Sequence, residues 1–524
     1  MFLYNLEAKF NSGINMAYEK LDPSWAYKIT ETVRILTLLF VDDGILTSSK
    51  KEALVTQFET LKSEFLKMGL RLNPDKCASL VLLPNKKKKY TVVDTRPLLE
   101  VDGKPVPTMG VEDVYKYLGL KLGYGGFKTK DVVSSFEEKI ERLHASALRP
   151  QQKLWGLKTC LIPSVYHSLV LSNCFLNTLR HLDKVTRKYV RRWLHIPNDT
   201  PLPMFYAAVR DGGLGIQSLE YTVCRLRRDR VQRLEQSDDA VVRALMEGRQ
   251  SQQLIKRLTK VRKLGMLNVV DKKTERQAWR TELLGRADGR GTAQMGDTRG
   301  IHQWITDPKF RIKGGEFVKA IQIRCGVVKT PARAARGGGR GSPLCALDGQ
   351  HADLNHILQV CQGTHGLRVE RHDGFVKRMR SSLQRSGFRC LTEPRIPVRN
   401  SFLKPDLIAW DSRRVIVMDP IICGDRVRLS EREAEKVTHY NRVEVLEFAR
   451  EASSREWPWE KETKVMGVAI SNRGAVRPST VQALRSIGVG ARYLNFLLVA
   501  SLVASWRMIK AYGHATSHRR RLQR

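Results

Sequence analysis

Positive charge extends along the whole of this 524-residue chain and limits the folds that it can adopt. Lysine and arginine number 91 against 53 aspartates and glutamates, which gives a formal net charge of +38. Such an excess repels itself in a compact fold unless a polyanion is the working partner. Because the basic residues are spread rather than gathered in one tail, they predict a long nucleic-acid track. The alternative is a basic protein of another kind, such as one associated with the ribosome.

Length and cysteine usage narrow the class of protein further. The chain is long enough for roughly two to four domains, each with its own core. Its nine cysteines are an odd number and widely scattered, which argues against a disulfide framework and for a reducing compartment. The first ten residues lack an apolar signal core, and the longest apolar run, Leu494 to Ala504, is interrupted by Asn495 and Ser501. We therefore expect that run to be a buried helix or strand, and no membrane insertion.

Two adjacent acidic residues, Asp42 and Asp43, lie between apolar runs at 33–40 and 44–48 that predict two strands, and helical periodicity follows over Lys50–Met68. A tight turn between strands places adjacent carboxylates where they can share divalent metal ions. Polymerases need such a pair because two metal ions activate the attacking hydroxyl and neutralise the leaving pyrophosphate. Aspartates are also common in turns without any metal, and that alternative stays open.

This order of elements, followed by the segment Gly69 to Lys76, resembles the catalytic palm of reverse transcriptases. The resemblance implies that Asp42 and Asp43 are catalytic ligands of Mg²⁺ or Mn²⁺, and that Lys76 lies near the phosphates of the incoming nucleotide.

A mainly helical pattern follows from Phe136 to about Glu235, and residues 236–330 stay helical but are more polar. Four strings resemble the thumb of site-specific non-LTR retrotransposons inserted in ribosomal DNA: Tyr115–Gly119, Leu148–Leu154, Arg191–Pro197 and Val209–Ile216. Arg191 and Arg192 are predicted to contact a phosphate backbone, with solvated charge as the alternative.

In this family a further catalytic aspartate and the primer–template grip precede the Asp-Asp turn. Only 41 residues precede Asp42, and Leu3 to Leu6 resembles the tail of the motif just before the turn. We therefore expect an N-terminally truncated protein without autonomous polymerase activity, since a two-metal site that lacks a principal ligand loses nearly all of its rate.

A cysteine–histidine segment, with Cys345, His356 and Cys361, is similar to the zinc knuckle of the same family. The family pattern has two cysteines before the histidine, and Asp348 occupies the position of the second. A closed structural zinc site needs four ligands, so the resemblance implies Zn²⁺ held by these three residues and Asp348. The alternative is a small helical hairpin with one satisfied histidine and two free thiols.

Beyond residue 365 the pattern becomes mixed α/β. Asp406 follows a proline, and Asp419 comes at the end of a strand predicted over Val415–Met418. Restriction-type nucleases hold a divalent cation with such a pair, and the metal polarises the phosphodiester. A helix is predicted over Ser430–Ala449, on which Lys436, four residues before Tyr440, shares a face with it.

These two residues resemble the displaced lysine–tyrosine pair of the retrotransposon endonuclease, in which the lysine orients the nucleophilic water or stabilises developing charge. The alternative is an ordinary amphipathic helix. Arg371 and His372 match an arginine–histidine segment of that family, and with Arg368 they are predicted to bind DNA.

We thus predict a multidomain protein of the α/β and α classes. Its predicted parts are a partial reverse-transcriptase palm (1–85), palm end and helical thumb (86–235), basic helical linker (236–340), zinc-knuckle-like segment (341–364) and restriction-enzyme-like α/β endonuclease (365–524). Residues 331–341 are expected to be a flexible Arg/Gly boundary.

The predicted function is that of a retrotransposon reverse transcriptase/endonuclease that retains metal-dependent DNA nicking. Its partners would be RNA and DNA, encountered in the nucleus after synthesis in the cytoplasm. The alternative is a catalytically inactive relic that still binds nucleic acid.

Overall fold

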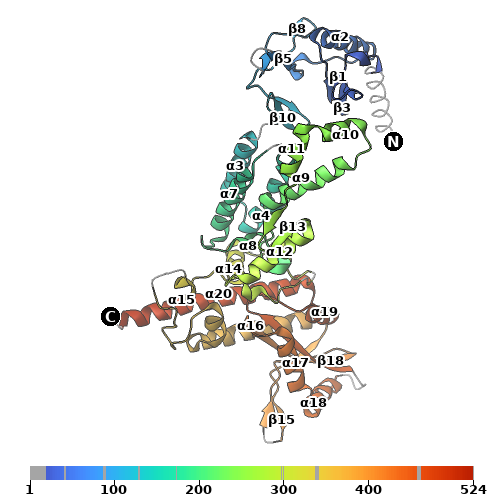
Figure 1. Ribbon diagram of the computed structural model, residues 1–524. Coiled ribbons are helices and arrows are strands. Elements are labelled where there is room, and N and C mark those ends of the chain that lie inside the picture. The colour runs from blue at the N-terminus through green and yellow to red at the C-terminus, as the bar shows by residue number, and fades with distance from the viewer. Residues whose placement is uncertain are drawn as a thin grey trace. The chain divides into compact units, whose positions relative to one another are not determined.

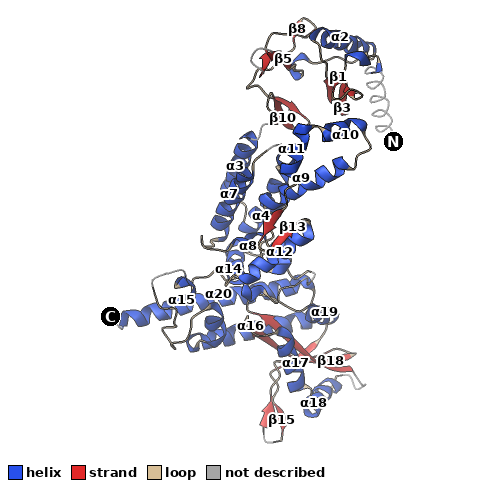
Figure 2. Cartoon of the chain, in the orientation of Figure 1, coloured by secondary structure: helices blue, strands red, loops and turns tan. Residues whose placement is uncertain are grey.

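The computed structural model describes residues 19–40, 43–85, 90–127, 130–172, 174–296, 298, 300–336, 341–399, 401–456 and 462–522. Its elements form two compact units (Figures 1 and 2). Unit 1 falls within residues 1–138, 163–182 and 219–262, and unit 2 within residues 139–162, 183–218 and 263–524. Asp42 lies outside the described residues.

A strand pair and a following helix are confirmed around the acidic residues of unit 1, although Val41 and Asp42 lie outside the described residues. The run at 33–40, predicted as one strand, forms two, of which the first, β2 (Arg34–Ile35), pairs with β1 (Tyr27–Lys28) instead. β3 (Thr37–Phe40) pairs antiparallel with β4 (Asp43–Leu46). α2 (Lys51–Lys67) follows, close to the predicted Lys50–Met68. Its apolar residues recur at helical spacing, so that one face is buried. That face carries Phe58, Leu61 and Phe65.

The remaining strands of unit 1 are short and pair with near neighbours. They are β1 (Tyr27–Lys28), β2 (Arg34–Ile35), β5 (Val81–Asn85), β6 (Tyr90–Asp94), β7 (Glu100–Val101), β8 (Lys104–Pro105), β9 (Tyr115–Tyr117), β10 (Leu120–Gly123) and β11 (Gly126–Phe127).

The middle of the chain is helical, as the periodicity predicts. Its helices are α3 (Lys130–Ala145), α4 (Pro150–Gly156), α6 (Tyr166–Leu171), α7 (Leu176–Leu194), α8 (Leu202–Tyr206), α9 (Leu219–Glu235), α10 (Ala240–Glu247), α11 (Arg249–Leu258), α12 (Lys272–Gly285), α13 (Gln303–Thr306) and α14 (Gly314–Cys325). One exception is a small hairpin of β12 (Arg262–Leu264) and β13 (Leu267–Val269), which the helical pattern did not predict. The boundary at 331–341 was expected to be flexible, but its start, Pro331–Ala334, forms the short helix α15, which the Thr330 side chain caps.

The C-terminal part of unit 2 contains a four-stranded mixed sheet in the order β14–β17–β18–β19. β14 (Arg389–Thr392), β17 (Leu407–Trp410) and β18 (Arg414–Cys423) pair antiparallel, whereas β18 and β19 (Glu462–Ser471) pair parallel. A separate pair is formed by β15 (Ile396–Val398) and β16 (Ser401–Leu403). The mixed α/β character expected beyond residue 365 is therefore confirmed.

Helices cover this sheet: α16 (His365–Arg385), α17 (Leu429–Tyr440), α18 (Val443–Ser454) and α19 (Pro478–Ser486). The single helix predicted over Ser430–Ala449 is wrong, because the chain leaves helical geometry at Asn441 and Arg442 and resumes as a second helix. Gly467 on β19 allows α17 to approach closely, since a Cβ there would lie 2.4 Å from the Glu433 carbonyl oxygen.

The last helix, α20 (Ala491–Leu522), contains the longest apolar run and packs against α14 and α16. The prediction of a buried element there is confirmed by Leu494, Leu497 and Leu498, each at most 1% exposed. By length and composition alone, Ala491–Ser517 could cross a membrane, but 56% of its most apolar window is buried inside the protein. The buried core helix of a protein outside a membrane can have the same length and composition, so these two properties are weak evidence for a membrane span.

Arg227 on α9 is a buried cation that satisfies a helix end. Its guanidinium donates to the carbonyl oxygens of Leu169 (2.6 Å), Ser172 (2.8 Å) and Cys174 (3.1 Å), at and just beyond the end of α6. The last carbonyls of a helix have no intrahelical partner, and a cation is the favoured partner there.

Replacing Arg227 with methionine should therefore destabilise unit 1. We expect Arg227→Met to lower the free energy of unfolding by about 2 kcal/mol or more, because three carbonyls lose a charged donor. Arg233→Met is the matched control on the same helix, since Arg233 is exposed and its Nε donates only to the Asp229 carbonyl oxygen. Equal urea midpoints for the two variants would contradict this role.

Candidate functional site

Two carboxylates lie side by side where neighbouring strands of the sheet part. Leu407 of β17 pairs with Met418 of β18, so the next position along each strand sets Asp406 opposite Asp419. Both side chains are largely buried, with 15% and 8% exposure. The predicted strand end at Met418 is wrong: β18 continues to Cys423, so Asp419 lies within the strand.

Beyond Met418, β18 is paired with β19 but no longer with β17. Pro420 is tolerated there because no neighbour on that edge needs its missing N–H group. The open edge leaves room beside Asp419 that a continuous ladder would fill.

Lys436 and Tyr440 reach this position from α17. Lys436 Nζ lies 2.9 Å from Asp419 Oδ1. The Tyr440 hydroxyl donates to the Lys404 carbonyl oxygen at 3.1 Å, which ties α17 to the segment just before Asp406. Burial, with the nearby Asp419 carboxylate, raises the pKa of Tyr440, so the phenol keeps its proton and acts as a donor.

His372 also belongs to this group of side chains, although the sequence predicted a DNA-binding role for it. Its Nε2 lies 3.1 Å from Asp406 Oδ2. The contact with Asp406 raises the pKa of His372 and outweighs the opposing effect of burial. The two residues are 34 positions apart and meet only because α16 packs on the sheet. No local pattern in the sequence could therefore predict their contact.

We call Asp406, Asp419, His372, Lys436 and Tyr440 the carboxylate cluster. Burial raises the pKa of Asp406, and the neighbouring Asp419 adds to this, while His372 and Lys436 oppose it. Among the described residues, Asp406 Oδ2 has no hydrogen bond of regular geometry despite being buried. Two converging, largely buried carboxylates fit a hard divalent cation such as Mg²⁺ or Mn²⁺, which prefers oxygen ligands.

Two residues predicted to contact DNA, Arg371 and Arg368, have partners inside the protein. Arg371 is 5% exposed, and its guanidinium donates to Ser505 Oγ (2.8 Å) and to the Leu358 carbonyl oxygen (3.1 Å). It is therefore a buried structural residue, and burial lowers its pKa to about 10. Arg368 is half-buried and donates to the Cys361 carbonyl oxygen at 2.9 Å.

The two arginines at the end of α7 differ from each other. Arg191 is half-buried, lies 4.8 Å from the Phe205 ring centroid and donates to the Asn198 carbonyl oxygen. Arg192 is exposed, so its charge is the more available of the two for a phosphate.

At the N-terminal site, only part of the predicted constellation is described. Asp43 is exposed at the start of β4, and Lys76 is exposed in a short 3-10 turn, Pro74–Lys76. Burial raises the pKa of Tyr115 and Tyr117 on β9, and the negative charge of Asp43 adds to both shifts.

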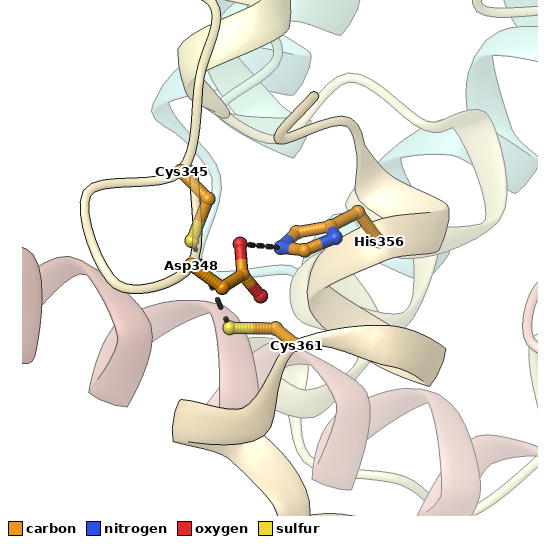
Figure 3. A group of neighbouring side chains, drawn as sticks. All are labelled: Cys345, Asp348, His356 and Cys361. Atoms are coloured by element: carbon orange, nitrogen blue, oxygen red, sulfur yellow. Dashed lines mark hydrogen bonds and ion pairs between the residues drawn. The ribbon is translucent and has the colours of Figure 1, made fainter. Parts of the chain in front are cut away.

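A second group of ligating side chains consists of Cys345, Asp348, His356 and Cys361, the Cys–Asp–His–Cys group (Figure 3). One candidate ligand atom from each lies within 4.8 Å of the others. A turn carries the first two residues: Gly349, with φ +72°, donates to the Cys345 carbonyl oxygen, and the Leu347 N–H donates to Cys345 Sγ. The π-helix η7 (His356–Val360) carries the histidine and leads directly to Cys361.

The spacing of these atoms matches a tetrahedral zinc centre. Zn–S bonds of about 2.3 Å imply sulfurs about 3.8 Å apart, and Zn–N and Zn–O bonds near 2.1 Å imply about 3.4 Å between those ligands. The two sulfurs lie 3.9 Å apart, and His356 Nε2 lies 3.3 Å from Asp348 Oδ1. Within the described part of the chain, His356 Nε2 is also buried without a regular hydrogen bond. These residues fit a metal ion.

Comparison with curated proteins finds relatives among retrotransposon polyproteins. Homologues at 27–28% identity over most of the chain are Pol polyproteins of R2 non-LTR retrotransposable elements, and the chain is consistent with part of an R2-type element. The predicted resemblance is confirmed at this level. No family model matches the chain.

Two relatives illustrate the similarity. The Retrovirus-related Pol polyprotein from type-2 retrotransposable element R2DM of Drosophila melanogaster is 28% identical over 463 residues, which are 88% of this chain and 43% of the relative. The Retrovirus-related Pol polyprotein from type-1 retrotransposable element R2 of Nasonia vitripennis is 28% identical over 488 residues, 92% of this chain and 46% of the relative. The chain spans about half the length of these curated relatives.

The Cys–Asp–His–Cys group generates a prediction about metal affinity. We expect Asp348→Cys to bind Zn²⁺ more tightly than the wild type, since a thiolate is a softer ligand than a carboxylate, and Cys361→Ser to bind it more weakly. Competition with a chromophoric chelator measures both. Cys160→Ser is the control, because Cys160 is exposed and lies outside the group. Unchanged zinc affinity in Cys361→Ser would contradict the assignment.

Proposed function

We propose that this chain nicks DNA with a divalent cation held at the carboxylate cluster. The observation that carries the proposal is the convergence of Asp406, Asp419 and Lys436, from two strands and a helix, at one open edge of the sheet. The R2 relatives support a nucleic-acid substrate, since they are named as Pol polyproteins of retrotransposable elements.

Asp406 and Asp419 would hold the cation through carboxylate oxygens. When bound there, it would polarise the scissile phosphodiester and favour hydroxide as the nucleophile. Each of the other residues of the cluster has a role that follows from its contacts.

Lys436 lies against Asp419 and supplies a fixed positive charge beside the site of reaction, where it can orient the attacking water or stabilise developing negative charge. Tyr440 holds the Lys404 carbonyl and thereby positions the turn that presents Asp406. His372 orients the Asp406 carboxylate from the opposite helix, α16.

We further propose that the Cys–Asp–His–Cys group holds a structural Zn²⁺. Its ligand atoms are buried, and the group packs on α20 through Tyr512 and Ile509, which leaves little access for a substrate. A closed, buried site with four protein ligands is typical of structural zinc.

For the longer proteins that it resembles, the family-level activities are RNA-directed DNA polymerase and endonuclease. We propose that this chain contributes the endonuclease, with RNA and DNA as partners in the nucleus. An inactive nucleic-acid-binding relic is the alternative, and it predicts salt-sensitive binding without cleavage.

The central test replaces a carboxylate without changing its shape. We expect purified protein to nick supercoiled plasmid DNA with Mg²⁺, and Asp419→Asn to reduce nicking to background, because the amide carries no charge for the cation. Asp411→Asn is the control: Asp411 lies in the turn between β17 and β18 and is paired with Arg414 instead. Nicking by Asp419→Asn at the wild-type rate would sink the proposal, and no nicking by the wild type would favour the relic.

Lys436 provides a second, graded test. We expect Lys436→Met to lower kcat about 100-fold, the scale for removal of one preorganised charge-stabilising group. DNA affinity without divalent ions should change little, since one of 91 basic residues is lost. A loss of affinity with unchanged kcat would instead identify Lys436 as a binding residue.

A further inference from the structure

Unit 2 contains a cavity of about 640 Å³ that neither the carboxylate cluster nor the Cys–Asp–His–Cys group uses. Four segments line it: the turn after α7, one face of α14, residues 327–336 and the last part of α20. Cavities of roughly 300–1,000 Å³ are the usual size for sites that hold a small ligand or one unit of a polymer.

An aromatic side chain is fixed in the wall of this cavity. Trp506 of α20 donates from Nε1 to Gln322 Oε1 at 3.1 Å. Gln322 Nε2 in turn donates to the carbonyl oxygens of Leu194 (3.1 Å) and His195 (2.8 Å) at the end of α7. The indole is therefore tied through Gln322 to the end of α7 before any ligand arrives.

Much of the remaining wall is apolar. Ile196, Val328 and Ile509 line the cavity together with the indole. Lys319 lies over the Trp506 ring, 4.8 Å from its centroid, but is not a lining residue, so the indole presents to the cavity a part that Lys319 does not cover. Such a wall suits the flat apolar face of an aromatic ring.

The rim of the cavity is positively charged. Among the described lining residues, four carry a lysine or arginine charge and one carries a carboxylate. That carboxylate, Asp199, is paired with Arg333 at 3.0 Å. Asp288, behind the wall, neutralises part of Arg333 and Arg336. Lys329 and Lys510 are exposed at the rim.

We propose that this cavity binds one unpaired nucleotide of a single-stranded nucleic acid, with the base against Trp506 and the backbone phosphate near Lys329 and Lys510. Proteins that bind single strands combine aromatic platforms, on which bases stack, with cationic grooves that follow the backbone. A base within a duplex is already stacked and paired, so the cavity selects single strands. The proposal does not depend on nicking, because it concerns binding at residues outside the carboxylate cluster.

The test measures binding without divalent ions, so that no strand is cut. Fluorescence anisotropy compares a labelled 12-nucleotide single strand with the duplex of the same sequence. For Trp506→Ala we expect the Kd for the single strand to rise about 5- to 150-fold, the range for lost base–aromatic stacking, and the Kd for the duplex to stay unchanged. Trp155→Ala is the matched control, since Trp155 is an exposed tryptophan elsewhere in unit 2.

A double variant at the exposed rim guards against a folding defect at Trp506. Lys329→Ala with Lys510→Ala should weaken single-strand binding and reduce its salt dependence, whereas Lys309→Ala, at another exposed lysine, should not. Photo-crosslinking of a strand that carries 5-iodouracil should label Trp506 among the nine tryptophans.

Three results would overturn the proposal. One is wild-type single-strand affinity in both the Trp506 and the rim variants. Another is an equal loss of single-strand and duplex binding in them. The third is displacement of the labelled strand by a nucleoside monophosphate at the same concentration as the strand, which would show that the cavity binds free nucleotides rather than a strand.

Discussion

Two aspartates are held side by side, mostly out of water, where β17 and β18 part, and this electrostatic constraint organises the C-terminal part of unit 2. Burial raises the pKa of Asp406, and the neighbouring negative charge of Asp419 raises it further, so the ionised form of Asp406 is costly. The protein offsets this cost with Lys436 from α17 and His372 from α16, and Tyr440 anchors the adjoining turn. The positions of α16 and α17 on the sheet are thus stabilised by these ionic contacts as well as by apolar packing.

Buried charge is handled in a similar way elsewhere in the chain. Arg227 and Arg371 are both shielded from solvent, yet each guanidinium has partners inside the protein: backbone carbonyls for Arg227, and one carbonyl with the Ser505 hydroxyl for Arg371. Some of the cations that make up the +38 net charge therefore bind groups inside the protein and are not available to nucleic acid. Counting basic residues overestimates the binding surface, because it cannot separate these internal cations from exposed ones such as Arg192 or Lys510.

The local pattern predicted most of the elements, and it failed where one residue changes the geometry. The strand pair around Asp43 and the helix after it followed from alternation and helical spacing. The break at Asn441 did not, since apolar spacing continues in phase through Val445 and hides the end of α17. The extension of β18 past Pro420 was also missed, because proline usually ends a strand and is tolerated here only at an edge that β17 has left.

By itself, the sequence determined which residue types are available and in what order. That was enough for the resemblance to retrotransposon polyproteins, and for predicting the Pro-Asp turn, the lysine–tyrosine spacing and the four members of the Cys–Asp–His–Cys group. These are short-range properties, readable from spacing along one strand, helix or turn. Tertiary structure alone decided that His372 faces Asp406, that Arg371 faces the protein interior, and that Trp506 lines a cavity with Lys329. Those relations join residues 34 to 177 positions apart in the sequence. They arise from the packing of helices against a sheet and against one another, which depends on the shapes of whole faces rather than on any local pattern.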